Sequence, residues 1–255
     1  MTYVIPPPPT PRIPVAGGED AHYFPVRRIY CVGKNYADHV QEMGGDPQRD
    51  QPCFFTKPAD AVVPCDTTST AGTLKDDDVV AIPYPLATQN LHFEIELAVA
   101  IGRSSGDDDA QTTTTTKIPV NEASNYIYGY AVAVDLTRRD LQTAAKKNGL
   151  PWDVSKAFDR SAPISNIYPA FAPTSESSIW LRVVNDDGEH PRQQAVLGQM
   201  IWSVPEIISE LSGLFRLEPG DLILTGTPAG VGSINRQDKV VGGIEGLGEL
   251  SFIVT

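Results

Sequence analysis

The stretch NLHFEIELAVAIG, residues 90–102, alternates between two kinds of side chain and predicts a strand over residues 91–101. Four large apolar side chains would share one face, which is typical of a core: Ile95, Leu97, Val99 and Ile101. The opposite face would carry Glu94 and Glu96, followed by two alanines. Carboxylates at this spacing repel each other, and a hard divalent cation with oxygen ligands would remove the repulsion. The alternative is a solvent-facing strand with two unrelated glutamates.

A second alternating stretch, residues 127–135, predicts another strand and ends at Asp135. Asp135 would share a face with Ala131 and Ala133, and a predicted helix follows at once. Strand ends beside helix N-termini are common places for site residues. If the two strands are neighbours, Asp135 joins the two glutamates, and three carboxylates form a suitable ligand set for magnesium. Taken alone, Asp135 would be interpreted as a helix cap.

Capping signals and apolar periodicity predict three helices, over residues 36–43, 137–148 and 203–217. The third is the clearest, because Ser203 and Glu206 have capping-box spacing and a 3.6-residue apolar period follows. Thr137 and Asp140 have the same spacing at the start of the second helix. Asn35 is expected to cap the first helix.

The fold class follows from many short strands and few helices. Further strands are predicted over residues 29–33, 222–225 and 250–254, which indicates a mainly β, α+β protein built as a sandwich or roll. Four consecutive prolines favour an extended Pro-rich arm over residues 1–28, followed by a single catalytic domain over 29–255. Two segments rich in Thr, Ser, Gly and Asp lack an apolar period, so residues 66–78 and 103–124 are predicted to be surface loops outside the core.

Composition excludes several classes of function. The 255 residues carry a formal net charge of −12, which argues against a nucleic-acid partner. Three cysteines without metal spacing and four histidines make a zinc site or a disulfide framework unexpected. No apolar stretch is long enough for a membrane span, and the N-terminus lacks the pattern of a targeting peptide. A cytoplasmic location is therefore expected, with a mitochondrial one left open.

Two helical pairs and one loop are candidates for substrate chemistry. Arg139 and Gln142 are three residues apart, so they share a helix face, and an arginine fork suits a substrate carboxylate. An exposed basic helix is the alternative. His39 and Glu42 have the same spacing, which would orient a general base, although a surface pair has the same signature. The loop TGTPAGVG, residues 225–232, would let its backbone approach an anion closely.

These segments together resemble the fumarylacetoacetate hydrolase family. The resemblance covers most of the chain and includes IYCVGKNYADHVQEMG, PCFFTKPADAVV, NLHFEIELAVAIG and the closing GLGEL. Its most specific elements are the Glu-x-Glu strand, the Asp-x-Thr-x-Arg-Asp turn and the Thr-Gly-Thr-Pro-x-Gly-Val-Gly loop, in this order. Within the family, the Lys-Lys-x-Gly-x-Pro-Trp and Asn-Tyr-Ala-x-His-x-x-Glu-Met runs are most similar to acylpyruvate and fumarylpyruvate hydrolases.

The resemblance implies a fold, a site and a role for each matching residue. The fold would be a mixed β-sandwich roll of the family's C-terminal domain type, assembled as a homodimer. The metal, Mg²⁺ with Mn²⁺ as the alternative, would be bound by Glu94, Glu96 and Asp135. The catalytic residues would be His39 and Glu42, on a lid that orders when substrate binds, and Lys156, facing the substrate's oxo group. The substrate would also be bound by Arg139, Gln142 and Thr227.

The implied reaction is metal-dependent hydrolysis of the C–C bond of an acylpyruvate, such as fumarylpyruvate, to pyruvate and a carboxylic acid. The substrate would be a small 2-oxo or diketo acid, with no nucleic-acid or membrane partner. One rival is an oxaloacetate decarboxylase, which would use the same metal and enolate, and another is a related 2-oxo acid isomerase or dehydratase. His39 and Glu42 favour hydrolysis, because decarboxylation needs no activated water.

Overall fold

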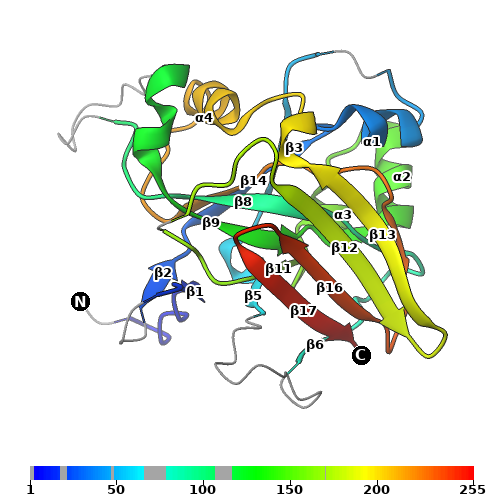
Figure 1. Ribbon diagram of the computed structural model, residues 1–255. Coiled ribbons are helices and arrows are strands. Elements are labelled where there is room, and N and C mark those ends of the chain that lie inside the picture. The colour runs from blue at the N-terminus through cyan, green and yellow to red at the C-terminus, as the bar shows by residue number, and fades with distance from the viewer. Residues whose placement is uncertain (1–2, 18–21, 47–48, 66–78, 107–116, 170) are drawn as a thin grey trace.

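The computed structural model describes residues 3–17, 22–46, 49–65, 79–106, 117–169 and 171–255. A mixed seven-stranded sheet forms its centre (Figure 1). Across this sheet the strands are β4 (Cys53–Lys57), β3 (Arg28–Gly33), β14 (Asp221–Leu224), β8 (Ile95–Ile101), β9 (Ile127–Val134), β11 (Ala162–Ile164) and β5 (Val62–Pro64). The β14–β3 and β11–β5 pairs are parallel and the other pairs are antiparallel.

A second sheet of five strands packs against the first. Its order is β13 (Gly188–Val196), β12 (Ser178–Asn185), β16 (Lys239–Ile244), β17 (Gly248–Val254) and β6 (Val80–Ile82). One hydrophobic cluster joins the facing surfaces, with Leu97 and Val132 from the first sheet and Leu181 and Phe252 from the second. The predicted mainly β sandwich is therefore confirmed, and its core lies between the two sheets.

The alternating pattern of the central strands separates two cores. The large apolar side chains of β8 belong to the cluster between the sheets, whereas Ala98 and Ala100 belong to a second cluster on the opposite face. That second cluster includes Ile13 of β1 (Arg12–Pro14) and Phe24 of β2 (Tyr23–Pro25), which pair as a hairpin in the N-terminal arm. Both faces of β8 are thus buried, so the alternative of a solvent-facing strand is wrong.

The strand predicted over residues 91–101 is in fact two strands that meet at Glu94. The first, β7 (Leu91–Phe93), pairs with β10 (Thr137–Arg138) and β15 (Gly232–Ile234) in a separate small sheet. The second, β8, pairs with β14 and β9 in the central sheet. Alternation alone does not reveal this break, because the side-chain pattern continues through it while the backbone partners change.

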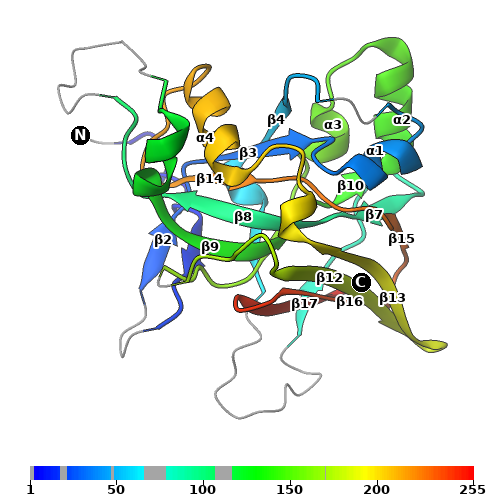
Figure 2. The same cartoon turned by 45° about the horizontal axis from the view of Figure 1, so that its top comes forward.

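Four α-helices and three 3₁₀ turns are described: α1 (Ala37–Glu42), α2 (Arg139–Asn148), α3 (Asp153–Lys156), α4 (Val204–Ser212), η1 (Ala59–Ala61), η3 (Val120–Tyr126) and η4 (Leu197–Gln199). Figure 2 shows α1, α2 and α3 gathered at one end of the central sheet, and α4 at the other end. The capping box of Ser203 and Glu206 is confirmed at the start of α4, which ends at Gly213 rather than at residue 217. No helix among the described residues is long and apolar enough to cross a membrane.

Two predicted caps are wrong, because tertiary partners take the capping side chains. The side-chain amide of Asn35 donates to the carbonyls of Trp202 and Thr225, at 3.0 and 2.7 Å, instead of capping α1. The carboxylate of Asp140 accepts hydrogen bonds from Thr88 and from the backbone N–H of Gln89. Helix α2 therefore begins at Arg139 without a capping box, and the two residues before it form β10.

The two predicted surface loops have different outcomes. Residues 66–78 lie outside the described residues, as do residues 107–116 of the second segment. In the rest of that segment Ile118 and Ala123 are buried in the main core, so the expectation of a fully exposed loop is wrong. The backbone N–H of Ile118 donates to the Ser212 hydroxyl of α4 at 2.8 Å, which holds this connection against the helix.

Candidate active site

The three predicted metal ligands lie together where the two small strands meet the central sheet. Glu94 occupies the break between β7 and β8, Glu96 is the second residue of β8, and Asp135 follows β9 directly. The backbone N–H of Asp135 donates to the carbonyl of Glu94 at 2.8 Å, so these two positions are adjacent. Carboxylate oxygens of all three side chains lie within 4.8 Å of one another, and all three residues are buried.

Lys156, the last residue of α3, extends into this carboxylate group. Its ammonium lies 2.6 Å from Asp135 Oδ2 and 2.9 Å from Glu94 Oε2, and it donates to Thr137 Oγ1 at 2.6 Å. Only 2% of the Lys156 side chain is exposed. Burial opposes the charged form, but Asp135 and Glu94 outweigh it and raise the pKa of Lys156, which keeps the ammonium charged.

Lys57 is a site residue that sequence reasoning missed. Its side chain is fully buried, and Nζ lies 2.8 Å from Asp135 Oδ1. The same ammonium donates to the carbonyls of Leu136 and Lys156, which ties β4 to the segments that carry the site. A lysine at the end of a strand is ordinarily exposed, so nothing local in CFFTK distinguishes it.

Arg139 connects the carboxylates to the predicted substrate-binding side chains. Its guanidinium donates to Glu94 Oε1, to Gln142 Oε1 at 2.5 Å and to His92 Nδ1 at 3.2 Å. Arg139 and Gln142 are buried, so the alternative of an exposed basic helix is wrong for this face of α2. Burial, and next the charge of Arg139, lowers the pKa of His92 to about 4. His92 was also missed, although it alternates with Glu94 and Glu96.

The three carboxylates are not equivalent in charge. Burial would raise the pKa of Glu94, but Lys156 and Arg139 outweigh it and the pKa is lowered. Burial, followed by repulsion from Asp135 and Glu94, raises the pKa of Glu96 well above its usual value. Glu96 accepts one hydrogen bond, from the backbone N–H of Gly226 at 2.7 Å, and no cation among the described residues forms an ion pair with it. A divalent cation beside these three oxygen donors would relieve this repulsion, so the group fits such an ion.

The predicted dyad on α1 is partly buried. His39 Nδ1 lies 3.4 Å from Glu42 Oε2, and His39 is only 8% exposed, so the alternative of a surface pair is wrong for the histidine. Glu42 also accepts from the backbone N–H of Gly230 at 3.1 Å, which ties α1 to the glycine-rich loop. Burial lowers the pKa of His39, although Glu94 and Glu42 act in the opposite direction. The imidazole is therefore neutral at neutral pH and can accept a proton.

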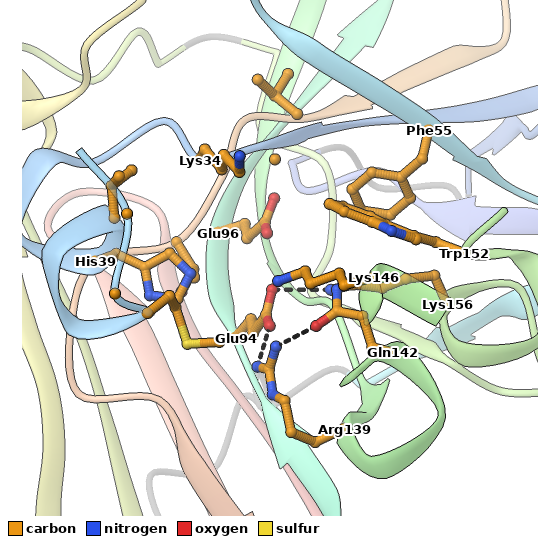
Figure 3. A pocket seen from close by; sticks show the side chains of 17 residues that line it. Lys34, His39, Phe55, Glu94, Glu96, Arg139, Gln142, Lys146, Trp152 and Lys156 are labelled. Atoms are coloured by element: carbon orange, nitrogen blue, oxygen red, sulfur yellow. Dashed lines mark hydrogen bonds and ion pairs between the residues drawn. The ribbon is translucent and has the colours of Figure 1, made fainter. Parts of the chain in front are cut away.

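A cavity of about 320 Å³ joins these groups. All the predicted site residues line it except Glu42 and Asp135, and Figure 3 shows His39, Glu94, Glu96, Arg139 and Lys156 around it. Thr227 of the glycine-rich loop closes one wall and accepts a hydrogen bond from Gln193 Nε2 at 2.8 Å. Gln193 Oε1 accepts from the backbone N–H of Ile95 at 3.0 Å, so this missed residue fixes the loop relative to β8.

A mainly β fold with a cavity that contains buried carboxylates and a histidine is typical of an enzyme that acts on a small molecule. The family model described as fumarylacetoacetate (FAA) hydrolase C-terminal matches residues 28–255. The chain belongs to the fumarylacetoacetate hydrolase family. It is therefore an enzyme of the hydrolase, lyase or isomerase type.

Similar proteins fall into two groups. A crystal structure of fumarylpyruvate hydrolase from Pseudomonas aeruginosa, in complex with Mn²⁺ and pyruvate, is 43% identical. It superposes with a TM-score of 0.87 and covers 100% of this chain and 99% of that one. The mitochondrial oxaloacetate tautomerase FAHD1 of Arabidopsis thaliana is 40% identical over 89% of this chain and 90% of its own length. The human protein of the same name is 38% identical over 89% of this chain and 91% of its own.

Proposed function

We propose that this enzyme hydrolyses the C–C bond of an acylpyruvate, such as fumarylpyruvate, in a reaction that depends on Mg²⁺ or Mn²⁺. The observation that carries the proposal is the placement of His39, a neutral base held beside Glu42, in the same cavity as Glu94 and Glu96. Decarboxylation needs no base to activate water, whereas hydrolysis does. The similarity to a fumarylpyruvate hydrolase that was crystallised with Mn²⁺ and pyruvate supports the same reaction.

The metal would be held by Glu94, Glu96 and Asp135, whose oxygens lie within 4.8 Å of one another. When bound, a divalent ion supplies Lewis-acid chemistry, which withdraws charge from the substrate's oxygens. The protein adds the ammonium of Lys156 beside the same carboxylates, so a second positive charge is fixed before the substrate arrives.

Arg139 and Gln142 would bind the carboxylate of the pyruvate half. The guanidinium is already held by Glu94, Gln142 and His92. Arg139 would therefore lose little conformational entropy when the substrate binds. Lys156 would face the 2-oxo group, and Thr227 would close the cavity over the substrate. In this arrangement the acyl group would lie toward the part of the cavity that His39 lines.

His39 would then take a proton from water as the water attacks the acyl carbonyl. The C–C bond between that carbonyl and the pyruvate methylene breaks, and the electron pair leaves as the enolate of pyruvate. The imidazolium returns its proton to the enolate carbon, so one water is consumed and the products are pyruvate and a carboxylic acid. Glu42 would orient the imidazole and stabilise its charged form through the Nδ1 contact.

A second candidate is the interconversion or decarboxylation of oxaloacetate, with the same cavity and the same enolate-forming chemistry. It is favoured by the similarity to two oxaloacetate tautomerases, at 40% and 38% identity. In that case His39 would not be required for water activation.

The two candidates are separated by a substrate panel. Several acylpyruvates, fumarylpyruvate and oxaloacetate are assayed for kcat/KM with Mg²⁺, with Mn²⁺ and with chelator. We expect acylpyruvate cleavage that is lost with chelator and restored by added metal. Turnover of oxaloacetate without cleavage of any acylpyruvate would contradict the hydrolase proposal and favour the second candidate.

We also propose that the enzyme is a cytoplasmic homodimer. Light scattering measures the mass directly, and a mass of one 27.6 kDa chain would contradict the dimer. Fractionation of the source cells tests the location.

A further inference from the structure

Gln193 of β13 is a buried glutamine whose side-chain amide joins two segments of the active site. Its Oε1 accepts from the backbone N–H of Ile95 at 3.0 Å, and its Nε2 donates to Thr227 Oγ1 at 2.8 Å and to the carbonyl of Pro228 at 2.7 Å. The residue is 2% exposed and does not itself line the cavity, whereas Thr227 does. An effect of Gln193 on a ligand would therefore pass through its hydrogen-bond partners.

The contact with Ile95 satisfies a backbone group that the central sheet leaves without a strand partner. The carbonyl of Glu94 accepts from Asp135 on the β9 side, so the N–H of Ile95, in the same trans peptide unit, points the other way. Strand β14 lies on that side, but its pairing with β8 ends at Ala98 and does not reach Ile95. A buried N–H without an acceptor is costly, which holds the oxygen of Gln193 at this position.

These partners also determine which end of the amide faces Thr227. The N–H of Ile95 can only donate and the carbonyl of Pro228 can only accept, so the amide oxygen faces the first and the amide nitrogen faces the second. The other N–H of that nitrogen is then directed at Thr227 Oγ1. The Thr227 hydroxyl is thus an acceptor in its contact with Gln193.

The proton of the Thr227 hydroxyl remains available to a ligand. A hydroxyl carries one proton, and no protein group in the described part of the chain accepts it from Thr227. The backbone just before Thr227 is also fixed, because the N–H of Gly226 donates to Glu96 Oε2 at 2.7 Å. Thr227 is 3% exposed and lines the cavity together with Glu96, so an acceptor for its proton has to be an atom inside the cavity.

We propose that Gln193 is a positioning residue for ligand binding, which fixes the Thr227 hydroxyl as a hydrogen-bond donor to an oxygen of the bound 2-oxo acid. This role rests on the proposed function for the identity of the ligand, although both candidate reactions use a 2-oxo acid. A carboxylate or keto oxygen can accept this proton, whereas an ammonium group cannot. Gln193 would therefore contribute to the choice of ligand without touching it.

A double-mutant cycle on the affinity for pyruvate tests this role. Isothermal titration calorimetry at saturating Mg²⁺ measures the Kd of pyruvate for the wild type, Gln193→Met, Thr227→Val and the double variant. Thr227→Val should weaken binding about tenfold, because a hydrogen bond to a charged ligand is lost. Gln193→Met should weaken it about fivefold, because the freed hydroxyl can turn to the carbonyl of Pro228. The double variant should bind within about twofold of Thr227→Val, because the two residues act through one hydroxyl.

Controls separate this role from general support of the loop. Gln194→Met changes the exposed neighbour on the opposite face of β13 and should keep the wild-type Kd. Thr227→Ser keeps the hydroxyl, so adding Gln193→Met to it should again weaken binding about fivefold. The Mg²⁺ affinity of each variant is measured separately, because Gln193 also holds Ile95 between two of the proposed metal ligands.

Two results would overturn the role of Gln193. One is an equal loss of pyruvate affinity from Gln193→Met with and without the Thr227 hydroxyl, since the glutamine would then only support the loop. The other is a wild-type Kd for Thr227→Val, a result that does not require the glutamine variant to fold.

The outcome is distinguishable from failure of the hydrolase proposal. If no acylpyruvate is cleaved but the losses in the cycle are not additive, the reaction was misassigned and the role of Gln193 stands. If acylpyruvates are cleaved and the losses add, the hydrolase proposal stands and the role of Gln193 is wrong.

Discussion

Asp135 and Asp221 are both fully buried aspartates at strand ends of the central sheet, yet their surroundings differ. Asp221 begins β14 and accepts from Arg27 at 3.0 Å, from Arg28 at 3.4 Å and from the backbone N–H of Glu218 at 3.0 Å. Those arginine side chains are 45% and 36% exposed, so the countercharges reach solvent. Asp135 pairs with two lysines whose side chains are 0% and 2% exposed.

The difference shows that a buried, paired carboxylate is not by itself a site. Among the described residues, Asp221 belongs to no group of three metal-binding side chains, and no cavity lined by catalytic groups opens beside it. Asp135 stands beside two other carboxylates, and one of these, Glu96, has no ion-pair partner in the described part of the chain. Both sets of acids are buried, so burial does not distinguish them. The candidate metal site differs from Asp221 in having neighbouring carboxylates that repel one another next to a cavity.

The largest effect is expected for Glu96→Gln, which removes one of the three neighbouring negative charges. The substitution tests whether the repulsion between these carboxylates serves metal binding. Glutamine can still accept from Gly226 but contributes no charge, so metal-dependent activity should fall by about 10⁴-fold. The metal-free protein should become more stable by about 1 kcal/mol or more, because burial and repulsion from Asp135 and Glu94 both disfavour a charge at Glu96. Metal affinity and thermal unfolding in chelator measure the two effects. A variant that is both inactive and less stable without metal would contradict the conclusion that repulsion distinguishes the carboxylates around Asp135 from Asp221.

The next effect concerns the base beside the carboxylates. His39→Ala should reduce acylpyruvate hydrolysis by about 10³-fold, because it removes the base proposed to accept the proton of water. Glu42→Gln should have a milder effect, since the imidazole remains but loses its charged partner. Any decarboxylation of oxaloacetate should survive both changes, because it needs no activated water. Rates of hydrolysis within about threefold of wild type would show that His39 is not the base.

Asp221→Asn should have the opposite effects to Glu96→Gln: the stability should fall while the activity is retained. Removing the charge that holds Arg27 and Arg28 should lower the free energy of unfolding by about 2 kcal/mol. The kcat/KM should stay within about twofold of wild type, because Asp221 does not touch the cavity. Urea denaturation and steady-state kinetics measure the two quantities. A loss of activity in a stable variant would show that the two aspartates are coupled.

The smallest effect is a displacement of the pH profile. The proposed mechanism needs neutral His39. Burial lowers the pKa of His39 below the usual 6.5, so the imidazole stays deprotonated as the pH falls to that value. The acidic limb of kcat/KM should therefore have its midpoint below pH 6.5, with activity lost only below it. The pH profile of the residual activity of His39→Ala should lack this acidic limb. A midpoint above 6.5 would mean that the carboxylates, rather than burial, control the imidazole.

Local patterns predicted the parts of the fold that depend on neighbouring residues. The alternation of β8 correctly separated its two faces, and the capping box at Ser203 correctly located the start of α4. Predictions failed where distant partners competed for a side chain. The side-chain amide of Asn35 donates to the carbonyls of Trp202 and Thr225 instead of capping a helix. These partners are distant in the sequence, so a local pattern does not reveal them.

The sequence by itself determined the mainly β class, the family motifs and the residues from which a site would be built. Only the tertiary structure decided that Asp135 lies beside Glu94, because this depends on which strands pair across the sheet. It also decided that Lys57 is buried with them, and that Gln193 joins β8 to the glycine-rich loop. Alternation fixes the face on which a side chain lies, whereas charge compensation depends on groups far apart in the chain, and these meet only when the chain is folded.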